Sequence, residues 1–268
     1  MSSAIIKIEL YQPCAQYRNP FTFYYAQSYP LPPRSTVIGM IKNLLGKFDL
    51  NENLEFVICG KYGSVFNHYS SFIKGREILF EPSGLMILQE RRGKKIKEPL
   101  FISQRTPLYQ QELQDVHLEI FVKSSEELIN EILAKLQNLN KLLTLGRGSD
   151  IVFIRRMLMI NKEKVKEVEV KDKLMVRGTN ILVPAKYFEK INFQRATMFW
   201  MAREIDYKDG NNYLYSIFST DRTTARRNVS FEKVYYLEEG GHILKEGSKL
   251  RVEYYEEDGR LKLPLFWW

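Results

Sequence analysis

The sequence predicts an α+β fold, because segments of alternating hydrophobicity are interleaved with two segments of helical periodicity in the order β-α-β-β-α-β. That order is typical of the ferredoxin-like, RRM-type arrangement. A turn-rich interval separates the second predicted strand from the third, and a strand-rich region follows residue 160. We therefore expect an RRM-like domain at residues 1–160, with a long β-hairpin insertion at about residues 67–113, and a small β-rich C-terminal domain at residues 161–268.

The first predicted strand covers residues 4–10 (AIIKIEL), where alternate apolar side chains share one face. A helix is predicted next, because Pro32 and Pro33 interrupt the preceding segment and Ser35 is suited to cap a helix N-terminus. Gly46 is placed to end this helix. The apolar residues at helical spacing are Val37, Ile38, Ile41, Leu44 and Leu45.

Three further strands are predicted at residues 55–66, 116–122 and 151–160, each an apolar or alternating run. Ser124 and Glu127 form a capping-box pattern, which predicts the start of a second helix. The apolar residues of this helix are Leu128, Ile132, Leu136, Leu139 and Leu143, and Gly146 ends the segment.

The interval between the second and third strands carries a basic tract at residues 91–97 (RRGKKIK), in which five of seven residues are positively charged. Glycine and proline punctuate the interval, which predicts a β-hairpin. Cations at a hairpin tip are suited to clamp an RNA backbone, and a solvated, flexible loop is the alternative. The candidate RNA-binding residues here are Arg91, Arg92, Lys94, Lys95, Lys97 and Arg105.

The chain of 268 residues has a formal net charge of +8, which favours an anionic partner such as nucleic acid. Hydrophobic residues make up 44% of the chain, yet no apolar run approaches ~18 residues, so we expect no membrane span. There are two cysteines, and none of the three histidines stands at metal-ligand spacing. We expect no metal or other cofactor, and reduced thiols in a cytoplasmic protein.

Two other segments carry residues suited to phosphate. The first includes Tyr17 and Arg18 and leads to Arg34, Ser35 and Thr36 at the predicted start of the first helix, where free backbone N–H groups favour an anion. A purely capping Ser35 and a solvated Arg34 are the alternative interpretation.

The second segment is the loop at residues 145–150 (LGRGSD). Gly146 and Gly148 let the backbone approach a ligand closely, and Arg147 can fork onto a phosphate. A plain helix C-cap is the alternative for this loop. A basic loop at residues 221–227 is a further candidate.

Enzyme signatures are lacking, since the sequence has no Walker A, HExxH or G-x-S-x-G pattern. RNA cleavage without a metal needs a general acid and base, often His, Tyr or Lys. His117 lies inside an alternating strand and is interpreted as structural, whereas a catalytic role for His68 stays open.

The segments Y-R-N-P-F-T at residues 17–22 and Y-P-L-P-P-R-S-T-V-I-G-M-I-K-N-L-L-G at residues 29–46 resemble the Cas-five family, the RAMP-type subunits of CRISPR interference complexes (Cascade). The loop L-G-R-G-S-D at residues 145–150 is similar to the glycine–arginine loop of that family. The predicted layout also agrees, with the hairpin insertion as a thumb. Gly148 departs from the family pattern, in which a bulkier or charged residue is common, so fewer phosphate contacts are expected there.

The resemblance implies a non-catalytic RNA-binding subunit that binds and caps the 5′ handle of the crRNA. Its implied partners are the Cascade backbone subunit, which the thumb contacts, the large subunit that reads the PAM, and target DNA near the PAM. The motifs look closest to the type I-B branch. Two alternatives stay open, a metal-independent endoribonuclease that processes precursor crRNA and a general RNA-binding assembly protein.

Overall fold

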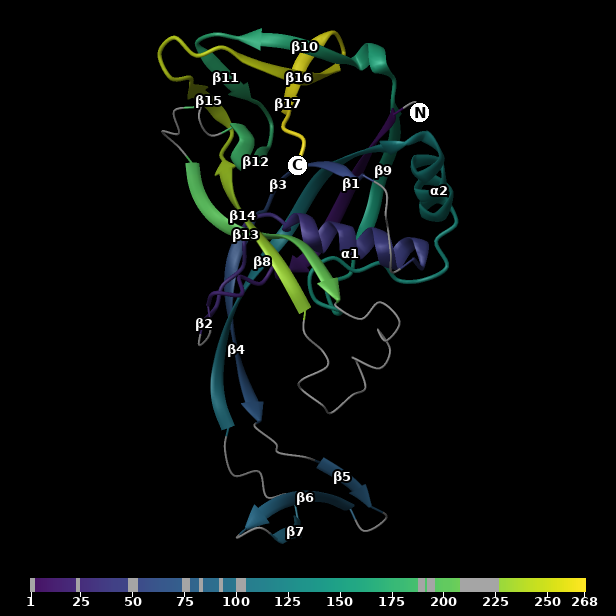
Figure 1. Ribbon diagram of the computed structural model, residues 1–268, viewed down its shortest axis with the longest axis vertical. Coiled ribbons are helices and arrows are strands. Elements are labelled where there is room, and N and C mark those ends of the chain that lie inside the picture. The colour runs from purple at the N-terminus through teal and green to yellow at the C-terminus, as the bar shows by residue number, and fades with distance from the viewer. Residues whose placement is uncertain are drawn as a thin grey trace.

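The computed structural model describes residues 3–22, 25–47, 53–73, 78–81, 84–91, 94–99, 105–187, 191, 196–207 and 227–268. This part of the chain is mostly β-structure with two α-helices, in agreement with the predicted α+β class (Figure 1). The helices are α1 (Arg34–Leu45) and α2 (Glu126–Gln137), with short 3-10 helices η1 (Lys162–Lys164) and η2 (Ala185–Tyr187). The strands are β1 (Ser3–Ala15), β2 (Tyr25–Ala26), β3 (Glu55–Lys61), β4 (Ser64–Ile73), β5 (Ile78–Glu81), β6 (Gly84–Arg91), β7 (Lys94–Pro99), β8 (Arg105–Ser125), β9 (Phe153–Ile160), β10 (Val165–Val170), β11 (Lys173–Val176), β12 (Asn180–Pro184), β13 (Ala196–Tyr207), β14 (Arg227–Leu237), β15 (Gly240–Ile243), β16 (Leu250–Glu257) and β17 (Arg260–Leu265).

The main sheet has nine strands, and its longest path runs β13-β14-β12-β3-β8-β1-β9. Strand β8 pairs antiparallel with both β1 and β3, and β1 pairs antiparallel with β9. Helix α1 lies between β1 and β3 in the chain, and α2 lies between β8 and β9. Both helices pack on one face of these four strands, where they bury Ile6, Ile8 and Leu10 of β1. The apolar faces that helical periodicity predicts are therefore the faces that pack against the sheet in this core.

Helix α1 has the apolar face and the end that its sequence predicts. Gly46 adopts a left-handed conformation (φ 69°), and its N–H donates to the carbonyl oxygen of Asn43. The predicted start is wrong, because Pro33 is the N-cap and Ser35 is the second helical residue. Pro33 has an extended backbone conformation (φ −60°, ψ 153°), so the helix begins directly after it. The buried residues are Val37, Met40, Ile41, Leu44 and Leu45.

Helix α2 begins one residue later than predicted. The hydroxyl of Ser125 caps the first turn, while the hydroxyl of Ser124 is buried and donates to the carbonyl oxygen of Asn53. The helix ends at Gln137, so the predicted continuation to Gly146 is wrong. Asparagine at positions 138 and 140 has low helix propensity, which explains the earlier end.

The second predicted strand divides into β3 and β4 at residues 62–63. Strand β3 pairs with the last part of β8, as in Lys61 opposite His117, whereas β4 pairs with its first part. Between them the N–H of Gly63 donates to the carbonyl oxygens of both Gln114 and Asp115. Asp115 has a positive φ of 55°, so the two strands bend together at this point.

The predicted hairpin interval projects from the main sheet (Figure 1). Strands β4 and β8 continue as an antiparallel ladder, from Ser64 opposite Gln114 to Ile73 opposite Arg105. Beyond the ladder, β5, β6 and β7 form a separate three-stranded sheet. The projection therefore carries a small sheet at its far end.

Three strands of the predicted C-terminal domain extend the main sheet, because β12 pairs with both β3 and β14, and β14 pairs with β13. The other C-terminal strands form two smaller sheets, β10-β16-β17 and β11-β15. Their apolar residues pack in a second core with Val57, Cys59 and Phe121, which lie on the face of the main sheet opposite the helices. The main sheet is therefore covered on both faces.

Lys7 is a buried cation between the main sheet and the C-terminal strands. Its side chain is 1% exposed, and its Nζ lies 2.7 Å from Glu9 Oε1 and 2.6 Å from Glu119 Oε2. The ammonium also lies 5.8 Å from the ring centre of Phe121 and 5.4 Å from that of Tyr255 on β16. Burial alone would lower the pKa of Lys7, but the hydrogen bonds and charges of Glu119 and Glu9 outweigh burial and raise that pKa. Lys7 is therefore charged and connects β1, β8 and β16.

We expect Lys7→Ala to lower the free energy of unfolding by about 3 kcal/mol, because two carboxylates would lose their cation at a buried site. Urea denaturation measures this change. The control is Lys47→Ala, which removes an exposed ion pair with Glu131 at 2.6 Å that is worth less than about 1 kcal/mol. Equal losses of stability in the two variants would show that the buried ion pairs stabilise the fold no more than the exposed one.

Candidate nucleic-acid interface

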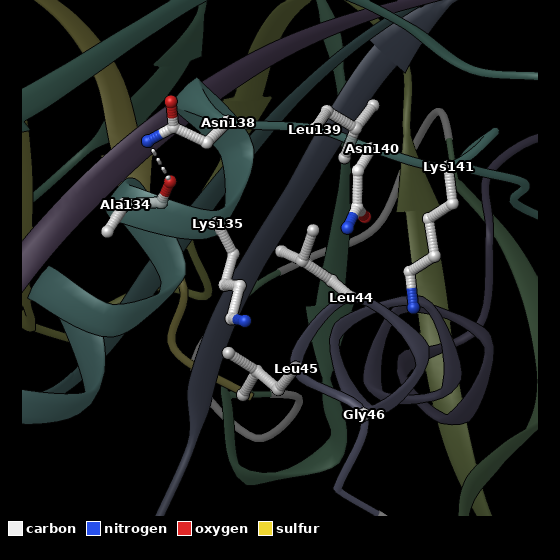
Figure 2. Close-up of a pocket in the computed structure, with 9 residues that line it drawn as sticks. All are labelled: Leu44, Leu45, Gly46, Ala134, Lys135, Asn138, Leu139, Asn140 and Lys141. Carbon is white, nitrogen blue, oxygen red and sulfur yellow. Dashed lines mark hydrogen bonds between the residues drawn. The ribbon is translucent and has the colours of Figure 1, made fainter.

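A hollow of about 430 Å³ lies where the C-terminal ends of α1 and α2 meet (Figure 2). It is lined by Leu44, Leu45, Gly46, Ala134, Lys135, Asn138, Leu139, Asn140 and Lys141. Lys141 donates to the backbone and side-chain oxygens of Asn43, so it serves the C-terminus of α1. This lining includes no carboxylate, histidine or cysteine.

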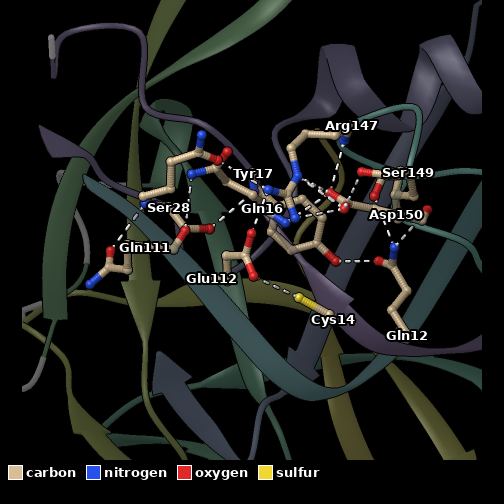
Figure 3. A network of polar contacts seen from close by, with 12 residues as sticks. Gln12, Cys14, Gln16, Tyr17, Ser28, Gln111, Glu112, Arg147, Ser149 and Asp150 are labelled. Atoms are coloured by element: carbon tan, nitrogen blue, oxygen red, sulfur yellow. Dashed lines mark hydrogen bonds and ion pairs between the residues drawn. The ribbon is translucent and has the colours of Figure 1, made fainter. Parts of the chain in front are cut away.

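A buried carboxylate, Asp150, joins the loop at residues 144–151 to the end of β1 (Figure 3). The residue is 3% exposed, and its Oδ2 accepts the backbone N–H groups of Gln16 and Arg147, both at 2.9 Å. Its Oδ1 accepts from the Ser149 hydroxyl at 3.3 Å and from Arg147 Nε at 3.0 Å. A buried charge is tolerated only with such partners. One side chain therefore fixes the position of the loop relative to β1.

Gln12 and Tyr17 complete this connection from the side of β1. Gln12 Nε2 donates to the carbonyl oxygens of Leu145 at 2.9 Å and Asp150 at 3.3 Å, and Tyr17 Oη donates to Gln12 Oε1 at 2.6 Å. Burial, with the charge of Asp150, raises the pKa of Tyr17 well above its usual value, so the hydroxyl stays a donor. Tyr17 was predicted to contact RNA, but its ring is 1% exposed and belongs to this buried network.

Arg147 is held by two carboxylates. Its Nη1 lies 2.5 Å from Glu112 Oε1 on β8, and its Nη2 lies 2.9 Å from Asp150 Oδ1. Burial alone would lower the pKa of Arg147, but hydrogen bonds to Asp150 and Glu112 raise it. A phosphate contact by this guanidinium would therefore compete with both ion pairs, and that contact stays a prediction.

Cys14 lies beside the same carboxylate. Its Sγ donates to Glu112 Oε2 at 3.3 Å. Burial, and then this hydrogen bond, raise the pKa of the Cys14 thiol to about 11. The thiol is therefore protonated at neutral pH and acts as a donor to Glu112.

The two loop glycines have different surroundings. Gly146 has a φ of 109°, and a Cβ there would lie 2.8 Å from both Asp150 Oδ2 and the carbonyl oxygen of Gln16. Glycine is therefore required at position 146. Gly148 is exposed, and a Cβ there would meet nothing within 4 Å. The loop is not a helix C-cap, because α2 ends at Gln137.

Gly148 and Ser149 form the centre of a turn that the N–H of Asp150 closes by donating to the carbonyl oxygen of Arg147 at 3.0 Å. Within the part of the chain that the structure describes, the N–H groups of Gly148 and Ser149 have no acceptor. Exposed backbone N–H groups in a turn are suited to phosphate oxygens. This turn, which we call the open turn, is the part of the loop that is available to a ligand.

Arg18 follows the buried Tyr17 and is exposed. Its backbone forms an isolated antiparallel bridge with Ser28. Among the described residues it forms no ion pair, so its charge is available to an anion. The prediction that Arg18 contacts RNA agrees with this exposure and stays a prediction.

The start of α1 does not present a free arginine. The guanidinium of Arg34 donates to the carbonyl oxygens of Leu54 at 2.9 Å and of Arg203 and Trp268 at 3.3 Å. Burial, followed by the charge of Arg203, lowers the pKa of Arg34. Ser35 and Thr36 lie half-buried in the same first turn. Arg34 therefore connects α1 to β13 and to the last residue of the chain.

The predicted basic tract lies on adjacent strands of the projecting small sheet. Arg91 ends β6 and pairs with Lys94 at the start of β7, which also contains Lys95 and Lys97. Arg105 begins β8. Arg92, and residues 221–226 of the predicted basic loop at residues 221–227, lie outside the described residues. The backbone therefore places four of the predicted cations in one hairpin.

His117 lies inside strand β8, as predicted, and its side chain points to solvent, so its interpretation as a structural residue stays a prediction. Its side chain is 57% exposed, and its Nε2 lies 3.1 Å from Asp115 Oδ1. Tyr11 of β1 lies beside His117, and Phe153 of β9 lies beside Tyr11 on its other side; sequence reasoning missed this group. Alternation alone could not find the group, because it requires the register of three strands that are far apart in the sequence. His68 on β4 is also exposed.

Among the residues that the structure describes, no group of three or more His, Cys, Asp or Glu is arranged to bind a metal ion. No helix in the same part of the chain is both long and apolar enough to cross a membrane.

Comparison with protein families gives a match over most of the chain. A family model described as CRISPR-associated protein (Cas_Cas5) matches residues 5–239. No curated protein matches the sequence.

Three solved structures are similar at low identity. A chain of a CRISPR RNA-guided surveillance complex is 13% identical over 92% of this chain and 95% of that chain, with a TM-score of 0.49. The crystal structure of a Cas protein is 14% identical over 88% of this chain and 95% of that chain, with a TM-score of 0.39. A chain of the Type III-B Cmr-beta complex bound to cognate target RNA and AMPPnP is 11% identical over 88% of this chain and 86% of that chain, with a TM-score of 0.41. These likenesses are too weak to support an assignment of function.

We expect Gly146→Ala to lower the free energy of unfolding by about 1–3 kcal/mol, because the new Cβ would meet Asp150 and the backbone of Gln16 at a left-handed position. Gly148→Ala is the matched control, since its Cβ enters open space in the same loop. Thermal and urea denaturation measure both variants. If the two variants lost the same stability, the Asp150 contact would not be what fixes the loop.

Proposed function

Because the chain belongs to the CRISPR-associated Cas5 family, we propose that it is a non-catalytic subunit of a type I CRISPR interference complex (Cascade). In this proposal it binds and caps the 5′ handle of the crRNA and contacts the backbone and large subunits. The family match over residues 5–239 is the observation that carries the proposal. The net charge of +8 supports an RNA partner.

The proposed RNA seat combines the open turn with Arg18. Gly148 and Ser149 offer two N–H donors, and Arg18 offers a cation that is not engaged by any described carboxylate. Arg18 lies two residues beyond Gln16, whose N–H is bonded to Asp150. The same carboxylate therefore anchors both parts of the seat, which reduces the entropy lost when RNA binds. Arg147 contributes by shaping the loop, and Arg34 by fixing the start of α1.

The projecting hairpin serves in this proposal as the thumb of a ferredoxin-like RAMP domain. Its basic tract, with Arg91 and Lys94 opposite each other, lies at the far sheet and away from the main core (Figure 1). Cations so placed can reach the RNA backbone where it meets the adjacent backbone subunit. A type I-B complex, contact with the large subunit and proximity to target DNA near the PAM belong to the same proposal.

A second candidate function is metal-independent cleavage of precursor crRNA, and the exposed His117 favours it. His117 pairs with Asp115 at 3.1 Å, and its ring centre lies 5.1 Å from that of Tyr11. Lys61 is the residue opposite His117 on β3. These are residue types that can supply a general acid and base.

The RNA-binding proposal predicts that the purified chain binds repeat RNA with an affinity that falls steeply with salt. Arg18→Ala should weaken binding several-fold and reduce the slope of log K against log salt by about 0.7, the value for one phosphate contact on a single strand. Fluorescence anisotropy over a salt series measures both quantities. Lys47→Ala is the control, because this exposed lysine is already paired with Glu131. An unchanged slope in Arg18→Ala would remove Arg18 from the seat.

Incubating the chain in excess with repeat RNA and EDTA separates the two candidate functions. The non-catalytic proposal predicts intact RNA on a denaturing gel. Cleavage that is abolished by His117→Ala and retained in His68→Ala would establish the second candidate instead.

A further inference from the structure

An exposed row of side chains crosses the main sheet on the face opposite the helices. Tyr11 of β1 stands between His117 of β8 and Phe153 of β9, which are its register partners on the two neighbouring strands. The guanidinium of Arg155 lies 4.6 Å from the ring centre of Tyr11. Lys61 of β3 continues the row beyond His117. We call Tyr11, His117, Phe153 and Arg155 the ring row.

The ring row is open because the C-terminal strands cover only part of this face. On β1, Lys7 lies under Tyr255 of β16, whereas Tyr11 lies four residues further along the same face. The side chain of His117 is 57% exposed, and Phe153 is 51% exposed. Phe153 adjoins Tyr11, and adjoining open rings on a sheet face indicate a site for a ligand or partner.

The rings contact one another at a tilt and are not stacked face to face. The ring centres of Tyr11 and His117 are 5.1 Å apart with the planes at 45°, and those of Tyr11 and Phe153 are 6.3 Å apart at 38°. Tilted rings at these distances leave flat surface exposed to solvent. The planar guanidinium of Arg155 presents a further flat group above Tyr11. Nucleic-acid bases stack on aromatic rings and on arginine planes of this kind.

The charges beside the row favour a polyanion. Glu9 and Glu119, on the same face of β1 and β8, are both bound by Lys7, and Glu239 is bound by Lys61 at 2.6 Å. The carboxylate of Asp115 contacts His117, with Oδ1 3.1 Å from Nε2. In contrast, Arg155 and its neighbour Arg156 form no ion pair within the described ranges.

We propose that the ring row is a base-stacking platform for single-stranded RNA. The bases would stack on Phe153, His117 and the Arg155 plane, while Arg156 faces the phosphates. This inference rests on the proposed RNA-binding function and adds a second contact region. The ring row would contact the bases, whereas the open turn would bind phosphate. Stacking tolerates any base, so the platform would hold RNA without selecting its sequence.

The test uses the full chain and repeat RNA in which single nucleotides are replaced in turn by abasic ones, which keep the phosphate and lose the base. We expect Phe153→Leu and Arg155→Gln to bind unmodified RNA about tenfold more weakly than wild type. The affinity of wild type should fall by a similar factor when one or two particular nucleotides are abasic. The affinity of the variants should not fall further at those positions, because the stacking contact is already lost. Leucine keeps an apolar side chain at this edge strand, and thermal denaturation checks that each variant is folded.

The matched control lies at the opposite edge of the same sheet. Trp200 of β13 is 45% exposed, and Lys233 lies 5.4 Å from its ring centre, so this pair repeats an exposed ring with a cation above it. Trp200→Leu and Lys233→Gln should bind RNA and respond to the abasic series as wild type does.

Each other outcome overturns a defined claim. If wild type binds RNA and the ring-row variants bind it equally well, this inference alone is overturned. A wild type that binds no RNA would overturn both this inference and the proposed function. Variants that keep their RNA affinity but lose co-purification with other subunits would show that the row docks a protein and that the platform is wrong.

Discussion

The Asp150 carboxylate is the contact on which the candidate RNA surface depends. It accepts N–H groups from the end of β1 and from the loop at residues 144–151, so two segments more than a hundred residues apart are held by one buried charge. Arg147 balances that charge and carries the connection on to Glu112 of β8. The loop is thereby fixed to two central strands, which lets its open turn offer backbone donors without first becoming ordered.

The main sheet explains where further contacts can form. One face is closed by α1 and α2, and the other is closed over part of its area by the small C-terminal sheets, with Lys7 as the buried cation between the layers. These layers leave the ring row and the projecting hairpin open. The surfaces we assign to RNA are therefore those that the packing of the core does not use.

Hydrophobic periodicity predicted much of the architecture, because the core faces of α1 and of the first strand depend on local spacing alone. It failed where the end of a strand or the identity of a cap depends on a residue that is distant in the sequence. Strand β3 ends at Lys61 because β8 bends at Asp115, and Ser124 is not a cap because its hydroxyl meets Asn53. The candidate site was predicted only in part, because some of its contacts also depend on residues that are distant in the sequence. The loop glycines were found from the sequence, but the ion pairs of Arg147 and the solvent face of His117 depend on strand register.

The central claim is that Asp150 holds Arg18 and the open turn as one seat for the RNA handle. Photocrosslinking tests it most directly, with 4-thiouridine placed along the handle RNA and the crosslinked peptides identified by mass spectrometry. The account predicts crosslinks in the peptides that contain Arg18 and the Gly148–Ser149 turn, and their loss in Asp150→Ala. Crosslinks confined to the β10-β16-β17 sheet, with none in either segment, would contradict it.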